Sequence, residues 1–61
     1  MIHSNEILLV SSGTLATLTN EKDYDKLESI RADWLNWFVN QTKEFANWQE
    51  CWIEYVAQSN N

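Results

Sequence analysis

The sequence predicts an α+β fold dominated by helix: a short β-hairpin over about residues 6–10 and 14–19, then two helices over about residues 21–39 and 43–57, or one long helix in their place. Two observations lead to this prediction. Two short runs of strand-like residues flank the single glycine, and after residue 20 large apolar residues recur at steps of three and four with no Gly or Pro. The chain of 61 residues has room for one domain, which we place over residues 1–61.

The hairpin prediction depends on the segment Ser11-Ser12-Gly13 and its two flanks. Ile7 to Val10 is apolar, and residues 14–19 are rich in β-branched Thr, although their alternation of apolar and polar residues is imperfect. Two such runs separated by about three residues that include Gly are typical of a β-hairpin. The alternative is an arm without fixed structure that becomes ordered on contact with a partner.

The helical prediction begins with Thr19 or Asn20 as N-cap, because acidic residues follow in the first turns, where they interact favourably with the helix dipole. The large apolar residues that come next fall on one stripe of a helical wheel. They are Tyr24, Leu27, Ile30, Trp34, Phe38, Phe45, Trp48, Trp52 and Tyr55.

Asn40-Gln41-Thr42 is a polar interruption in this aromatic region. Asn tolerates the left-handed conformation that ends helices, and Thr42 can cap a following helix. A single helix from residue 21 to residue 57 would be roughly 55 Å long, too long for a compact monomer of this size. We therefore expect two helices joined by a tight turn, whereas one continuous helix would nearly oblige the chain to dimerise along the stripe.

Eight aromatic residues, four of them Trp, are expected to form the structural centre. Those expected in the core include Trp34, Trp48 and Trp52. Trp37 lies at the margin of the stripe, and so short a chain does not easily hide all of its aromatic surface, so we expect Trp37 to anchor a partner. Arg31 interrupts the stripe, and the sequence leaves open whether it pairs with Glu28, stacks on an aromatic neighbour or is exposed.

The charge balance indicates which partners to expect. Nine acidic residues against four basic ones give a formal net charge of −5. Nucleic acids and anionic membranes both require clustered Lys and Arg, so neither is expected as a direct partner. A larger protein with a basic surface fits better, because opposite charge steers the encounter.

The acidic residues are grouped. Glu21, Asp25 and Glu28 lie together on the wheel opposite the stripe, and a further pair follows in the next segment. Like charges at i,i+4 cost about 0.2–0.5 kcal/mol each. The groups are therefore either a solvated face or a negative surface presented to a basic groove, which in its strong form imitates a nucleic-acid backbone. The predicted partner-binding residues are Glu21, Asp25, Glu28, Trp37, Glu50 and Glu54.

Catalytic, metal and cofactor sites are not expected. Cys51 is the single cysteine and His3 the single histidine, so a disulfide within the chain is excluded and a zinc site with four Cys or His ligands cannot be assembled. Cys51 is flanked by Glu50 and lacks the positive surroundings that activate a thiolate. There is no Gly-rich phosphate loop.

These observations predict a small acidic binding protein and not an enzyme. The N-terminal apolar stretch lacks a basic n-region and is too short and polar for a signal peptide, so we expect a cytoplasmic protein. The leading hypothesis is an inhibitor or modulator that occludes a basic, possibly nucleic-acid-binding, surface on a larger protein. Because such small acidic chains are common among phage and mobile-element products, the host cytoplasm would then be its location. The alternatives are a homodimeric assembly protein that uses the aromatic stripe as its seam, and a regulatory subunit or antitoxin that folds on its partner.

Overall fold

The computed structural model describes residues 2–59, and over this range the protein is all-α, with four helices, 72% of the residues helical and no strand. The helices are α1 (Ser4–Leu9), α2 (Ser12–Thr19), α3 (Tyr24–Val39) and α4 (Trp48–Ser59). The predicted α+β fold is therefore wrong, because the segment expected to form a hairpin, or else an unstructured arm, forms α1 and α2.

The physical reason for this correction lies at Ser11. Its side chain is the N-cap of α2, since Ser11 Oγ accepts a hydrogen bond of 3.1 Å from the backbone N–H of Thr14. Gly13 has a negative φ, so it supplies helix rather than the turn conformation that a hairpin needs. Thr17 and Thr19 donate their hydroxyl protons to carbonyl oxygens four residues earlier, which accommodates the β-branched side chains within a helix.

Asn20 ends α2 instead of beginning the next helix. It has a φ of 62°, the left-handed conformation of a C-cap, and its backbone N–H donates to the carbonyl of Ala16. Asp23 is the N-cap of α3, because its carboxylate accepts a hydrogen bond of 2.9 Å from the N–H of Asp25. The helix therefore begins at Tyr24 and not at residue 21.

Residues 40–47 separate α3 from α4, so two helices follow residue 23 rather than one. The second begins at Trp48 and not at residue 43, since its cap is formed by Asn47 and not by Thr42. Asn47 Oδ1 accepts from the N–H of Glu50 at 3.0 Å, and the Glu50 carboxylate accepts from the N–H of Ala46 at 3.2 Å. This reciprocal arrangement resembles a capping box.

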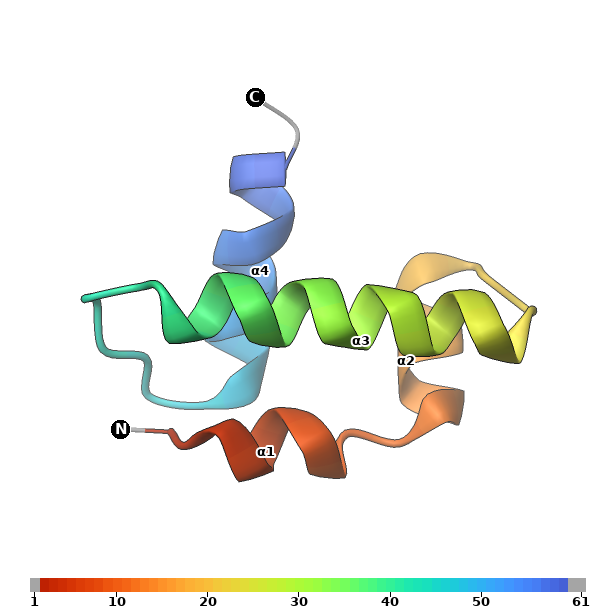
Figure 1. Cartoon of the computed structure of the whole chain (residues 1–61), viewed down its shortest axis with the longest axis horizontal. Coiled ribbons are helices and arrows are strands. Elements are labelled where there is room, and N and C mark those ends of the chain that lie inside the picture. The colour runs from red at the N-terminus through yellow and green to blue at the C-terminus, as the bar shows by residue number, and fades with distance from the viewer. Residues whose placement is uncertain (1, 60–61) are drawn as a thin grey trace.

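The central element is α3, which packs against each of the other three helices. In Figure 1, α3 crosses the middle of the molecule, α1 lies alongside it, α2 is near its N-terminal half and α4 passes behind it at a steep angle. Each helix contributes one fully buried side chain to the core: Ile7, Leu15, Trp34 and Cys51. Among the aromatic residues of α3, Trp34 is therefore part of the core, whereas Tyr24 is exposed.

Candidate binding surface

Trp34 organises the core between α3 and α4. Its ring makes edge contacts with Trp52, at a centroid distance of 5.0 Å, and with Trp48, at 6.3 Å. Its indole N–H donates to Cys51 Sγ at 3.3 Å. The aromatic stripe is thus folded onto itself: Trp34 is fully buried and the other two tryptophans are half-buried.

Cys51 is fully buried, in surroundings that disfavour its thiolate form. Burial raises the pKa of the Cys51 thiol above its ordinary value, and the hydrogen bond from Trp34 opposes this effect only in part. The thiolate is the nucleophilic form of cysteine, so a raised pKa disfavours reaction at neutral pH.

Trp37, predicted to be an exposed anchor, is half-buried between α3 and α4. Its ring lies 5.9 Å from that of Phe45 and 5.5 Å from that of Tyr55. Its indole N–H donates to Gln58 Oε1 at 2.9 Å. Trp37 thus has packing and hydrogen-bond partners within the chain. Its role in binding a partner stays a prediction without structural support.

Arg31 is buried, with 8% of its surface exposed. Its Nη1 donates to the carbonyl oxygens of Ile7 at 2.7 Å and Leu8 at 3.3 Å, and its Nε lies 3.3 Å from Glu28 Oε2. Of the arrangements that the sequence left open, pairing with Glu28 is present. The contact with the C-terminal end of α1, where cations are favoured by the helix dipole, had no signal in the sequence.

Four of the five predicted acidic residues have a hydrogen-bond or ion-pair partner for their carboxylates within residues 2–59. Glu21 lies before α3 and its carboxylate accepts from the N–H groups of Lys22 and Asp23. Glu28 pairs with Arg31, and Glu50 caps α4.

The last two predicted acids differ from each other. Glu54 lies 3.6 Å from Lys43 Nζ and also accepts from Gln58. Asp25 alone among the predicted acids is exposed with no hydrogen-bond or ion-pair partner for its carboxylate within residues 2–59.

Four exposed acids are outside the predicted set: Glu6 on α1, Asp23 at the cap of α3, Asp33 and Glu44. Asp33 lies on α3 eight residues after Asp25, about 12 Å along the helix axis. Glu44 lies in the 40–47 connection. Within the described part of the chain, neither the Asp33 nor the Glu44 carboxylate has a hydrogen-bond or ion-pair partner. The spacing of Asp33 from Asp25 was visible in the sequence, whereas the position of Glu44 was obscured by the expectation of a helix from residue 43.

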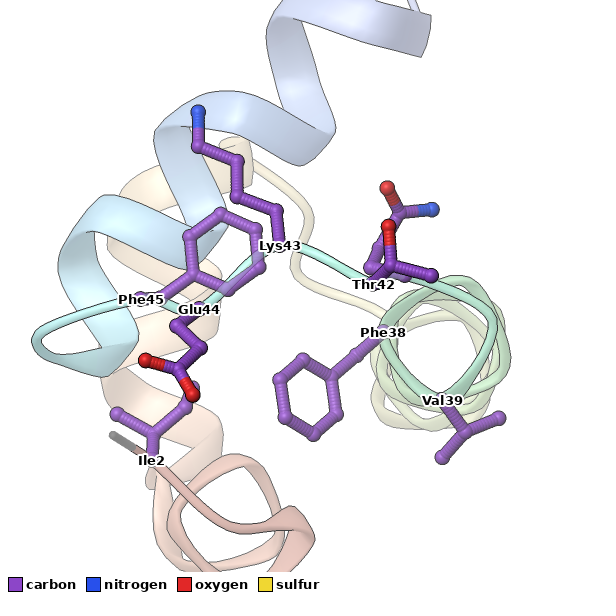
Figure 2. A pocket seen from close by; sticks show the side chains of 8 residues that line it. Ile2, Phe38, Val39, Thr42, Lys43, Glu44 and Phe45 are labelled. Atoms are coloured by element: carbon purple, nitrogen blue, oxygen red, sulfur yellow. The ribbon is translucent and has the colours of Figure 1, made fainter.

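A cleft with a volume of about 370 Å³ opens at the C-terminal end of α3. Its walls are formed by Ile2, by Phe38 and Val39 of α3, and by residues 41–45. Figure 2 shows the Phe38 ring on one side and the side chains of Ile2 and Glu44 on the other. The cleft combines apolar walls with an exposed carboxylate.

Large exposed apolar side chains come from all four helices, and the most exposed is Leu9, at 81%. No helix of residues 2–59 has the length and apolar character needed to cross a membrane. Over the same range, no three His, Cys, Asp or Glu side chains are grouped so that they could hold a metal ion.

No known family model matches the sequence, and comparison with curated proteins and with solved structures gives no significant match.

Proposed function

We propose that this chain is an inhibitor or modulator that binds a basic surface of a larger protein and blocks access to it. The observation that carries the proposal is the set of exposed carboxylates at Asp25, Asp33 and Glu44, to which no residue in the range 2–59 donates a hydrogen bond. Such carboxylates are available to the Lys and Arg residues of a partner.

The distribution of positive charge strengthens this proposal. The guanidinium of Arg31 is buried and is used by α1 and Glu28, so it does not offset the exposed acids. In addition, none of the four helices has a basic residue in its last turn, so the negative ends of their dipoles lack a cation from their own helix. With Arg31 buried, the basic residues left at the surface are Lys22, Lys26 and Lys43, in a chain with a formal net charge of −5.

The density of charge favours a basic protein surface in general over imitation of a nucleic acid. The 16 residues of α3 span about 24 Å, a length over which duplex DNA carries about 14 phosphate charges. Over that length α3 carries the carboxylates of Asp25, Glu28 and Asp33, of which Glu28 is paired with Arg31. The charges are too sparse to follow the phosphates of a nucleic-acid backbone.

The homodimeric alternative has less support, because the stripe proposed as its seam is occupied within the chain. Trp34 packs on Trp52, and Trp37 packs on Tyr55. Sedimentation at increasing protein concentration separates the two proposals, since a seam would give a dimer and the inhibitor proposal expects a monomer in the absence of its partner.

The test of the proposed function is affinity capture from a cell lysate at low and high salt. A partner held by charge should be captured at low salt and lost at high salt. Replacing Asp33 by Lys should reduce capture by slowing association. The matched control is Glu6→Lys, which changes the net charge equally at an exposed site on α1. Capture that ignores salt, or that is reduced equally by both variants, would contradict an electrostatic surface on α3.

A further inference from the structure

We propose that the cleft at the C-terminal end of α3 receives a long basic side chain, lysine or arginine, from the protein partner. The methylene stem would lie between Phe38 and Ile2, and the cationic head would contact the Glu44 carboxylate. This inference rests on the proposed function and adds to it the chemistry of one specific contact.

The shape of the cleft fits the stem of such a side chain. Its volume of about 370 Å³ is within the range of sites that bind small groups. Phe38 and Ile2 face one another across the opening (Figure 2). Long basic side chains bury their methylene groups along apolar surfaces of this kind while the charge stays accessible to a partner or to water.

The electrostatics of the cleft select a cation. Figure 2 shows the Glu44 carboxylate beside Ile2, and no residue in the range 2–59 is hydrogen-bonded to it or paired with it. The α3 helix ends at Val39 next to the cleft with no basic residue in its last turn, so its partial negative charge adds to that of Glu44.

Lys43 also borders the cleft, but its charge is directed elsewhere. Its Nζ lies 3.6 Å from Glu54 Oε2 and 5.7 Å from the centre of the Phe45 ring. In Figure 2 the Lys43 side chain extends away from Ile2, in the opposite direction to Glu44. A cation in the cleft would therefore face Glu44 without facing the ammonium group of Lys43.

The other occupants are less favourable on charge. A second copy of this chain carries a net charge of −5, so like charges would oppose its approach to Glu44. A neutral apolar group would pack against the walls but would partly desolvate the Glu44 carboxylate. It supplies no hydrogen bonds in place of those that the carboxylate makes to water. A long basic side chain uses both the walls and the charge.

The test uses blocked single amino acids as probes for the partner's side chain. N-acetyl-lysine-N-methylamide and N-acetyl-arginine-N-methylamide carry the proposed group, and the norleucine compound has a similar stem without the charge. Titration is followed by amide chemical shifts of the full ¹⁵N-labelled chain at low salt. We expect millimolar dissociation constants for both basic probes, with shifts centred on residues 38–45 and weaker binding of norleucine.

The Glu44→Gln variant should weaken binding of the basic probes about two- to fivefold, the range for an exposed ion pair. Glu6→Gln is the matched control, because it removes an exposed carboxylate on α1 outside the cleft, and it should leave the dissociation constants unchanged. Equal binding of norleucine, shifts spread over all acidic residues, or no effect of Glu44→Gln would overturn the inference. If capture from the lysate remains salt-sensitive in that case, the proposed function stands without this contact.

Discussion

The guanidinium of Arg31 on α3 donates a hydrogen bond of 2.7 Å to the carbonyl oxygen of Ile7 on α1, twenty-four residues earlier in the sequence. The last carbonyl groups of a helix have no partner inside the helix, and α1 has only six residues, so it is too short to be stable by itself. Arg31 provides both a hydrogen-bond donor and a positive charge at the negative end of α1. The position of α1 on α3 is thus maintained by this charged contact together with the burial of Ile7 and Val10 in the shared core.

Replacing Arg31 by Met should lower the free energy of unfolding by about 3 kcal/mol, because two carbonyl groups and Glu28 lose a charged donor. A domain of this size has a total stability of about 3–9 kcal/mol, so the variant should be close to unfolding. Arg31→Lys keeps the charge but lacks the forked geometry of the guanidinium. Its free energy of unfolding should therefore lie between those of the wild type and Arg31→Met. Urea denaturation followed by circular dichroism measures all three. The exposed Lys26→Met change is the control and should stay within about 0.5 kcal/mol of the wild type.

Replacing Gly13 by Ala should raise the free energy of unfolding by about 0.5–1 kcal/mol. Gly13 is in α2 with a negative φ, and the nearest atom to an added Cβ is Ser11 Oγ at 3.9 Å, so Ala fits and has the higher helix propensity. If Gly13 were in a hairpin turn with positive φ, Gly13→Ala would instead lower the free energy of unfolding. The control is Ala32→Gly on the exposed side of α3, which should cost about 1 kcal/mol.

The raised pKa of Cys51 predicts a loss of stability at high pH. The unfolded chain releases the thiol proton near the ordinary value of 9.0, whereas burial holds the proton in the folded chain to higher pH. The contribution of the protonated Cys51 thiol to the free energy of unfolding is therefore complete below pH 9.0. It is lost as the pH rises towards the folded-state pKa. Urea denaturation between neutral pH and pH 10 tests this, with Cys51→Ala as the control that lacks the titrating thiol. Identical pH dependence of the two chains would contradict the prediction.

Trp34 and Trp37 should respond differently to the same substitution. Trp34→Phe removes a donor to Cys51 Sγ and part of a fully buried ring, so it should cost about 2 kcal/mol or more. Trp37→Phe removes an exposed hydrogen bond to Gln58 and should cost about 1 kcal/mol or less. Thermal denaturation of both variants gives the comparison. A larger loss of stability for Trp37→Phe than for Trp34→Phe would mean that the α3–α4 contact is centred on Trp37 instead.

Replacing Glu50 by Lys should reduce stability rather than act on binding alone, because the Glu50 carboxylate accepts from the N–H of Ala46 at the start of α4. The expected loss is about 1 kcal/mol, the usual effect of removing a cap and reversing a charge at a helix N-terminus. Asp33→Lys, at an exposed site with no described partner, should change stability by less than about 0.5 kcal/mol. Equal losses would show that Glu50 has no special role in the cap.

The extent to which the sequence predicts this structure depends on how local each determining contact is. The three- and four-residue spacing after residue 23 correctly indicates helix, and the burial of Trp34 follows from its central place in the stripe. The segment Ser11-Ser12-Gly13 is compatible with either a turn or a helix start. In the structure the Ser11 cap begins α2, and Ile7 and Leu15 are buried in the core that α1 and α2 share with α3. The local cap was visible in the sequence, whereas the burial against α3 was not.

The same difference between local and distant contacts applies to the candidate binding surface. The Asn47-to-Glu50 spacing is a recognisable capping pattern, so the role of Glu50 in the helix start had a sequence signal. The pairing of Glu28 with Arg31 follows from their spacing on one helix. By contrast, the contact of Glu54 with Lys43 and the place of Glu44 beside Ile2 depend on the path of the 40–47 connection, which periodicity does not describe.

The hydrogen bond from Arg31 to Ile7 also constrains the order in which the chain can assemble during synthesis. The ribosome releases α1 first, yet the residue that completes the C-terminal end of α1 is in the middle of α3. While only the first thirty residues have been synthesised, α1 lacks both the Arg31 hydrogen bond and most of the helix on which it packs. The helix α1 therefore cannot acquire this hydrogen bond, or pack against α3, before the middle of α3 has been synthesised.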